Sequence, residues 1–337
     1  MNIKSDLMLN NRTEYLKQIG VPDHHDDCIP AKCCPAFEEI DCEFSQLAYI
    51  CIFASDYVSV VDIIKGKRLY DIRVGLGPID IAIDRINQFG FVTNFSANTI
   101  SKINLNLRKT IATIPVGKSP AGISLSRDGR LLYVVHYGEP SVYVLDACTL
   151  NKITEIPLPS IGFQIDLAKN GRLAYVSLRN SSQIAIIDLS INLVVKVIPA
   201  GSGTECVRVS PSNQLVCVSN EEGDSITPVN VHLGESGIPY ITSPGMPVDM
   251  AFTSDSKQLY CANRADDTVS FIDLFTHKVI NKISCGPGPY GVEIVPERGR
   301  LIVSNTYSNT ISIIDTCSNT LRATVTVGYA PAFLAVL

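Results

Sequence analysis

The chain has 337 residues, of which 46% are hydrophobic and 18% are charged, and its formal net charge is -5. This composition is too apolar for a disordered chain and is typical of a folded protein with a large core. Mild acidity argues against nucleic-acid binding, which requires clustered positive charge against the phosphates. No stretch approaches the roughly 18 apolar residues of a membrane helix, so no membrane span is expected.

The first twenty or so residues lack the features of a secretory signal. Such a signal needs an apolar run of about 7–15 residues behind a basic start, whereas the longest early apolar run is Leu7-Met8-Leu9. A cytoplasmic location is therefore expected, in which the 11 Cys would be mostly free thiols. The alternative is a cell or spore surface reached by a route that needs no signal peptide.

An N-terminal arm, residues 1–43, precedes the first repeat and gathers His and Cys residues. Imidazole and thiolate are the preferred ligands of zinc, so a site for zinc or another divalent metal is one interpretation. A disulfide or an intermolecular cross-link in an oxidising location is the second, and free thiols are the third. No other cofactor is predicted. The candidate metal ligands are His24, His25, Cys28, Cys33 and Cys34, and the candidate cross-linking residues are Cys28, Cys33, Cys34 and Cys42.

Residues 44–337 contain seven copies of one repeat. Each copy has a strand that ends in Asp or Asn, and successive copies of this position are 42, 42, 42, 42, 43 and 42 residues apart. The positions are Asp62, Asn104, Asp146, Asp188, Asn230, Asp273 and Asp315. A turn residue keeps the same spacing, at Pro78, Pro120, Gly162, Thr204, Pro247, Pro289 and Pro331.

Four short segments of alternating apolar and polar residues fill each copy, separated by Gly, Pro, Asn or Asp. This is the pattern of strands joined by hairpins. Four strands in a repeat of about 42 residues are typical of one propeller blade. The sequence therefore predicts an all-β, seven-bladed propeller of four-stranded antiparallel blades over residues 44–337.

The two ends of the repeat region predict how the ring closes. The last segment, residues 331–337, is a single innermost strand, whereas the first copy begins at about Leu47 and lacks that strand. We therefore expect the C-terminal strand to complete the N-terminal blade by pairing with it.

The repeats resemble those of a known family. FVTN-FSANTISKIN at 91–104, LIVSN-TYSNTISIID at 301–315 and IPVGKSPAGISLSRDG at 114–129 are similar to the YVTN repeat of the YncE-like β-propellers. The resemblance covers residues 44–337 and implies a seven-bladed propeller. The family includes surface-layer propellers, binding-type proteins and relatives of enzymes, so the resemblance implies no single function.

The central channel of such a ring is the expected ligand site, because small molecules bind where polar groups converge in a hollow. Positions two and four residues past each turn residue should line it, and we expect Asp166 to pair with Arg208. The channel is either an acidic site for a cation or amine-bearing ligand, or a hydrated tunnel whose charges pair with one another. The candidates are Asp80, Gln164, Asp166, Arg208, Asp249 and Glu293.

Two other patterns are expected to be structural. Residues 286–291 match G-x-G-x-x-G, but a dinucleotide loop must join a parallel strand to a helix, and this segment is predicted to be a turn between blades. His136 takes a strand-end position that is Asn in other copies. We expect it to be an altered turn residue and not a catalytic base.

These features favour a non-enzymatic binding or scaffold protein that presents its loops or channel mouth to a protein or small-ligand partner. One alternative is a propeller enzyme, such as a lactonase-like hydrolase, that uses the channel mouth. The other is a surface-assembly protein that is cross-linked through the N-terminal cysteines. A metal in the channel would favour the enzyme, whereas a large apolar or Tyr-rich face with an empty channel would favour the scaffold.

Overall fold

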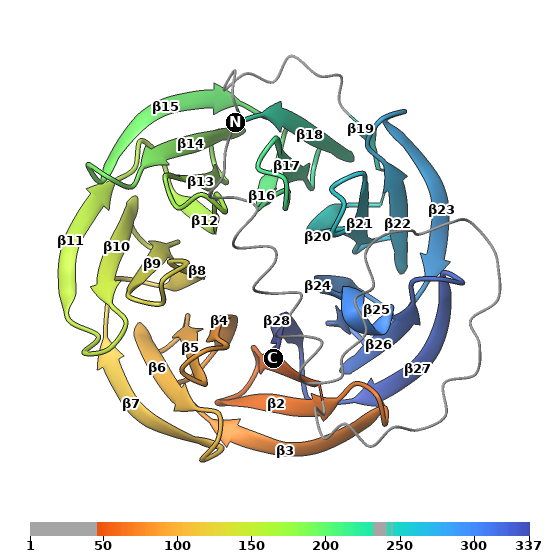
Figure 1. Ribbon diagram of the computed structural model, residues 1–337, viewed down its shortest axis with the longest axis horizontal. Helices are drawn as coiled ribbons and strands as arrows, with labels where there is room; N and C mark the ends of the chain where they lie inside the picture. Colours follow the sequence, from red (N-terminus) through yellow and green to blue (C-terminus); the bar gives the residue numbers. More distant parts are fainter. Residues whose placement is uncertain (1–45, 232–240, 244) are drawn as a thin grey trace, which may run out of the picture. The chain divides into compact units, whose positions relative to one another are not determined.

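The computed structural model describes residues 46–231, 241–243 and 245–337, which form seven four-stranded antiparallel sheets arranged as blades around one axis (Figure 1). The predicted seven-bladed propeller is confirmed. The helical structure in this described part is one short 3-10 turn, η1 (Pro296–Arg298). The following predicted residues of the arm lie outside the described residues: His24, His25, Cys28, Cys33, Cys34 and Cys42.

Each blade contributes one strand to each of four concentric positions. The innermost strands are β28 (Pro331–Val336), β4 (Pro78–Asp84), β8 (Pro120–Leu125), β12 (Gly162–Leu167), β16 (Thr204–Val209), β20 (Pro247–Phe252) and β24 (Pro289–Val295). The second strands are β1 (Leu47–Ile52), β5 (Phe89–Asn94), β9 (Leu131–His136), β13 (Leu173–Leu178), β17 (Leu215–Asn220), β21 (Gln258–Asn263) and β25 (Arg300–Asn305).

The two outer positions complete the blades, which we number 1 to 7 in this order. The third strands are β2 (Tyr57–Asp62), β6 (Thr99–Asn104), β10 (Ser141–Asp146), β14 (Gln183–Asp188), β18 (Ser225–Asn230), β22 (Thr268–Asp273) and β26 (Thr310–Asp315). The outermost strands are β3 (Lys67–Arg73), β7 (Lys109–Pro115), β11 (Lys152–Pro157), β15 (Leu193–Pro199), β19 (Ile241–Thr242), β23 (Lys278–Ser284) and β27 (Thr320–Thr326).

Blade 1 joins the two ends of the ring. The C-terminal strand β28 pairs antiparallel with β1, with Leu334 opposite Ile50, and the amide of Leu337 donates to the carbonyl of Leu47 at 2.9 Å. Figure 1 shows the C-terminus beside β28 and β2. The predicted closure, with one strand from the C-terminus and three from the N-terminal part, is confirmed.

The recurring Asn at the end of the second strand ties each hairpin together. Its side-chain amide donates to two hydroxyls on the third strand, so that Asn94 bonds Thr99 and Ser101, each at 2.9 Å. The same pair of bonds extends from Asn220, Asn263 and Asn305. Since a buried amide left without partners is costly, the YVTN-like motif is explained by this structural role.

The residue before that Asn links one blade to the next. Its hydroxyl donates to a carbonyl of the following innermost strand, from Thr93 to Ala121 and from Ser304 to Ala332, both at 2.6 Å. Apolar side chains fill the remaining space between blades. Tyr133 of blade 3, for example, is buried in one cluster with residues of blade 4. No blade buries both of its faces alone, so each depends on its neighbours.

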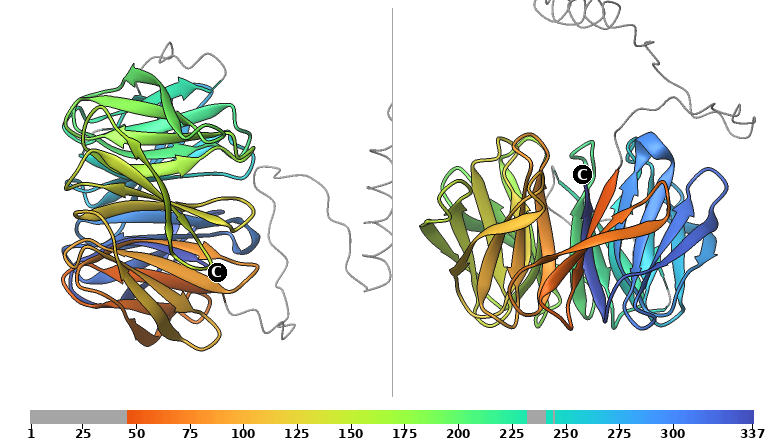
Figure 2. Two further views of the ribbon diagram at one scale, coloured as in Figure 1. Left: turned by 90° about the vertical axis from the view of Figure 1, so that its left-hand side faces the viewer. Right: turned by 90° about the horizontal axis from the view of Figure 1, so that it is seen from below.

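The ring has two faces, which Figure 2 shows from the side. At the start face the innermost strands begin, and the turns between second and third strands lie there too. At the end face the innermost strands end. The segment 286–291 lies at the connection between β23 and β24, as predicted, and Gly288 there has a φ of +66° that favours glycine.

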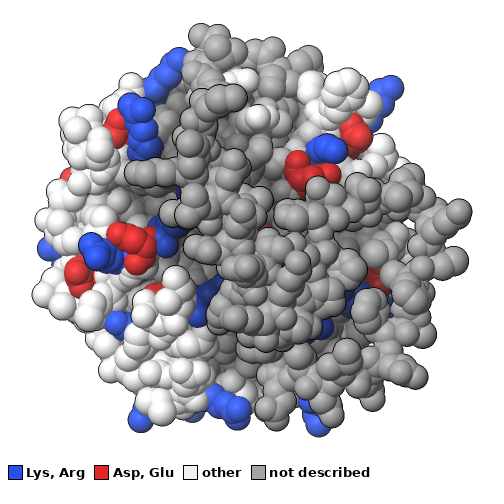
Figure 3. Space-filling view, viewed as in Figure 1, with Lys and Arg blue, Asp and Glu red and all other residues white. Residues whose placement is uncertain are grey.

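Charges of both signs lie side by side on the surface that is visible between the grey atoms of Figure 3. That mixture differs from the continuous basic patch typical of nucleic-acid-binding proteins. The part of the chain that the structure describes contains no helix with the length and apolar character needed to span a bilayer.

Deleting residues 331–337 should open the ring. Phe333, Leu334 and Val336 are each less than 10% exposed, and burial of one such side chain contributes about 1.5–3 kcal/mol. The free energy of unfolding should therefore fall by about 5 kcal/mol or more, with a large drop in the thermal midpoint. An unchanged thermal unfolding curve for the truncated protein would show that β28 does not close the ring.

Candidate functional site

A cavity of about 420 Å³ lies on the ring axis, among the ends of the innermost strands and the turns that follow them at the end face. All seven positions four residues past the turn residues line it, as the repeat predicts. These are Ala82, Ser124, Asp166, Arg208, Ala251, Glu293 and Ala335. The cavity thus contains four of the six candidate residues, because Asp80 reaches it from the layer below.

Gln164 and Asp249 do not line this cavity. Both are about 1% exposed and belong to a deeper layer of the ring, where the side-chain amide of Gln164 donates to Asp80 at 3.1 Å. The structure places these two residues below the lining of the cavity. Of the charged residues in this deeper layer, Asp80 lines the cavity and Asp249 does not.

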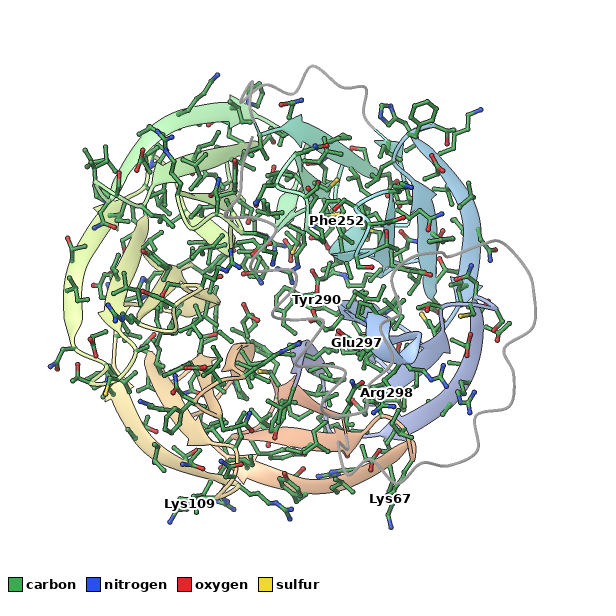
Figure 4. The ribbon with its side chains drawn as sticks, in the orientation of Figure 1. Lys67, Lys109, Phe252, Tyr290, Glu297 and Arg298 are labelled. Carbon is green, nitrogen blue, oxygen red and sulfur yellow. The ribbon has the colours of Figure 1, made fainter. Side chains whose placement is uncertain are left out.

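Aromatic side chains from blades 1, 4 and 7 lie together near the ring axis towards the start face. The ring centroids of Phe163 and Phe333 are 6.3 Å apart, and those of Tyr290 and Phe333 are 5.1 Å apart. Figure 4 shows Tyr290 near the ring centre, and both Phe side chains are buried. These aromatic rings lie on the start-face side of the cavity and do not line it.

Three aspartates of the innermost strands connect neighbouring blades. Asp80 accepts hydrogen bonds from the amide of Ile81 at 2.8 Å and from the amide of Ile123, in the next blade, at 3.0 Å. Asp166 and Asp249 make the same two bonds, with Leu167 and Val209 and with Met250 and Val292. We call these three carboxylates the aspartate bridges. Their lone pairs are used mainly by the backbone.

Arg208 pairs with Asp249 and not, as expected, with Asp166. Its guanidinium lies 2.7 Å from the Asp249 carboxylate, and its Nε donates to the carbonyl of Met250 at 3.2 Å. Asp166 is instead held by the amides of its own strand and of the next blade. The adjacency of blades 4 and 5 predicts a pair between Asp166 and Arg208, but it does not show that backbone amides bind the Asp166 carboxylate.

Burial raises the pKa of two acids at the pocket. Desolvation raises the pKa of Asp80 to about 6, although Arg208 and three hydrogen bonds favour the ionised form. Desolvation also raises the pKa of Glu293 to about 7, and the charge of Arg208 acts in the opposite direction. Groups with such values exchange protons near neutral pH, which is a common property of functional sites.

At the start face, a charged cluster that the sequence did not predict spans blades 4 to 6. Arg179 forms ion pairs with Glu205 and Glu221, and Arg264 forms a second ion pair with Glu221. The hydroxyl of Tyr290 donates to Glu205 at 3.2 Å. Both carboxylates are buried, and burial raises the pKa of Glu205. Buried ion pairs are costly to desolvate, so stability alone gives little reason for them.

An apolar surface continues from this cluster around blades 7, 1, 2 and 3. We call it the aromatic arc, and it consists of Phe53, Leu76, Phe95, Tyr137, Tyr307 and Tyr329. Phe95 lies 5.9 Å from Phe53 and 5.8 Å from Tyr137, measured between ring centroids. Tyr137 in turn contacts Phe163, whose ring lies near the axis, with 6.1 Å between the ring centroids. Phe53, Phe95 and Tyr137 of the arc are thus linked to Phe163 by consecutive aromatic contacts.

An alignment of the repeat copies could have found this face. The residue directly after each second strand is, in blade order, Phe53, Phe95, Tyr137, Arg179, Glu221, Arg264 and Thr306. Three aromatic residues are thus followed by three charged ones. Because the ring places these positions side by side, the three aromatic residues form an apolar region of the start face and the three charged residues form a polar one.

His136 and two of the cysteines lie inside the blades. His136 is fully buried, its ring lies 4.2 Å from that of Tyr143, and burial lowers its pKa to about 4. Cys217 and Cys261 are also buried, and desolvation raises the pKa of Cys217 to about 12. Within the described ranges, no three His, Cys, Asp or Glu side chains are placed to hold a metal ion.

Replacement of Arg179 by Met should destabilise the protein strongly. The change leaves the buried Glu205 without its cation, and breaking a buried pair in this way costs about 3–5 kcal/mol. Chemical unfolding would measure the loss. The matched control is Arg130→Met, which removes a cation whose partner Asp128 is largely exposed and should cost less than about 0.5 kcal/mol. Equal stability of the two variants would contradict a structural role for the cluster.

Comparison with known proteins finds one family model that matches part of the chain. Residues 159–297 match the model described as the YNCE-like beta-propeller, and no curated protein matches the chain. Among solved structures, the chain is similar to hydrazine synthase of Kuenenia stuttgartiensis, with 21% identity and a TM-score of 0.71. That similarity covers 77% of this chain and 90% of the other.

Two further structures are similar over most of their length. A functionally unknown protein from Desulfotomaculum acetoxidans DSM 771 has 15% identity and a TM-score of 0.76, covering 86% of this chain and 98% of the other. The dihydro-heme d1 dehydrogenase NirN, in complex with DHE, has 13% identity and a TM-score of 0.67, covering 96% and 84%. Identities this low show a shared fold alone. Residues 159–297 thus match the YNCE-like beta-propeller model, and the described structure is a seven-bladed propeller.

Proposed function

We propose that the chain is a binding protein that holds a protein partner on the aromatic arc of its start face. The observation that carries this proposal is the exposure of large apolar side chains there: Leu76 is 61% exposed, Tyr307 67% and Tyr329 73%. Large contiguous apolar patches mark sites of protein interaction. Tyrosine in particular is enriched at interfaces, because it offers an apolar ring and a hydrogen-bonding hydroxyl.

The arc is continuous across the two ends of the chain. The amide of Phe53 donates to Ala330 at 3.0 Å, which places it beside the loop that carries Tyr329. The hydroxyl of Thr306, next to Tyr307, donates to the carbonyl of Pro331 at 2.8 Å. Residues from the first and last copies of the repeat therefore form one surface.

The arc is also held rigidly. Its members lie in or beside short turns, and these turns are bonded to one another by their backbones, as in the bond from Phe95 to the carbonyl of Gly77 at 2.8 Å. A surface that is already ordered loses little entropy when a partner binds. The neighbouring cluster around Arg179 supplies a polar border, which is the usual arrangement around an apolar interface.

The enzyme alternative has less support from the described residues. It would act at the mouth of the axial pocket, where the aspartate bridges are used by the backbone and Arg208 is paired with Asp249. His136 is buried inside blade 3. The surface-assembly alternative depends on Cys28, Cys33, Cys34 and Cys42, which lie outside the described residues, and it stays a prediction.

Site-specific photo-cross-linking in cells of the source organism would test the proposal. A benzophenone amino acid at Tyr307 or at Tyr329 should capture the same protein from both positions. The matched control position is Phe275, which is 93% exposed in the turn between β22 and β23 and lies outside the arc. Capture of the same proteins from all three positions, or of none from the arc, would contradict the proposal.

Binding of the captured partner can then be measured with purified proteins. Tyr137→Ser and Tyr329→Ser should each weaken binding by about tenfold or more, because a buried aromatic residue at an interface contributes about 1–2 kcal/mol or more. Phe275→Ser should leave the affinity unchanged.

A further inference from the structure

The axial pocket at the end face has the size and shape of a small-molecule site. Its volume of about 420 Å³ lies within the range of about 300–1,000 Å³ that such sites have. On the start-face side of the pocket, the axis is occupied by the aromatic rings of Phe163, Tyr290 and Phe333, none of which lines the pocket. The pocket lies at the end face, so a ligand would enter it from that face.

The acidic residues of the pocket fall into two groups. The aspartate bridges already accept two backbone hydrogen bonds each. Glu293 differs from them: it lines the pocket from β24 and is half-buried, and no described residue donates a hydrogen bond to its carboxylate. Its oxygens are therefore available to a ligand.

The rim of the pocket carries the opposite charge. Arg85 follows β4, and one N–H of its guanidinium donates a hydrogen bond to the carbonyl of Val336 at 3.0 Å. A guanidinium has five such donors, so four remain. Lys169 follows β12, lines the same pocket and is exposed, and within the described residues its ammonium group forms no ion pair. The two cations come from blades 2 and 4.

The pocket therefore has a charge gradient along the ring axis. The inner part holds Asp80, Asp166 and Glu293 against one paired cation, Arg208, whereas the rim holds Arg85 and Lys169. A cation alone would be attracted to the inner part but repelled by the rim. An anion alone would be attracted to the rim but repelled by the inner part. A ligand that carries both charges, separated by a short chain, matches the whole pocket.

We propose that the axial pocket binds a small zwitterion, with an ammonium group at Glu293 and a carboxylate at Arg85 and Lys169. This site lies on the face opposite to the aromatic arc, so it does not depend on the proposed protein partner. Loss of either binding activity would leave the other intact.

Calorimetry on the full-length protein with three matched probes would test the charge requirement. The probes are 6-aminohexanoate, which carries both charges, hexylamine, which carries the positive one, and hexanoate, which carries the negative one. The zwitterion should bind at least tenfold more tightly than either of the others. Equal affinity for all three, or no binding of the zwitterion at millimolar concentration, would overturn the proposal.

Two variants locate the site. Glu293→Gln removes the inner charge, and Lys169→Met removes one rim charge, so each should weaken binding of 6-aminohexanoate by tenfold or more. The control is Glu297→Gln, which changes an exposed carboxylate in η1 that does not line the pocket. Binding should be unchanged by the control. A loss as large in the control as in Glu293→Gln would place the zwitterion elsewhere.

The pH dependence of binding gives a second readout. The other charged groups that line the pocket with Glu293 are Asp80, Asp166, Arg208, Arg85 and Lys169. The charge of Asp249, in the layer below, raises the pKa of Glu293 further. Since burial raises the pKa of Glu293 to about 7, its carboxylate is largely neutral at pH 6 and largely ionised at pH 8, whereas an alkyl ammonium stays charged throughout. Affinity for 6-aminohexanoate should therefore rise about tenfold from pH 6 to pH 8. The same rise in Glu293→Gln would assign the effect to another group.

Discussion

Hydrogen bonds from the innermost and second strands of one blade to the innermost strand of the next are the interaction on which the ring depends. A four-stranded blade has two apolar faces and must bury both against neighbours. Apolar packing supplies the energy but not the register, since it has no direction. Direction comes from polar groups: the Asp80 carboxylate accepts from the amide of Ile123, and the Thr93 hydroxyl donates to Ala121. Such bonds fix how far each blade is rotated from the last.

Side chains that hold the blades together are not available to bind a ligand or a partner. The aspartate bridges and the Asn residues of the second strands are bonded within the scaffold. Positions not used in this way are free to vary between copies. At the end face these include Glu293 and Lys169, and at the start face they include the aromatic arc. The repeat therefore provides a constant frame in which single copies carry the differences that make a site.

The sequence predicted the frame well because each copy repeats the same local chemistry. Spacing alone gave the number of blades and the closure by residues 331–337. The spacing could not predict the partner of Asp166. An aspartate at this repeat position can accept hydrogen bonds from backbone amides or pair with Arg208, and the sequence pattern is the same in both cases. That distinction depends on the angle between blades. The aromatic arc was missed because Phe53 and Tyr329 are far apart in the chain and become neighbours when the ring closes.

Hydrogen exchange of the Asp166→Ala variant, compared with the unmodified protein, tests the role of the aspartate bridges most directly. The amide of Val209 loses its acceptor in this variant. Exchange should therefore become faster in β12 and in β16, while blades 1 and 2 keep their protection. Unchanged protection at Val209 and along β16 would show that the blades are held together without the bridge.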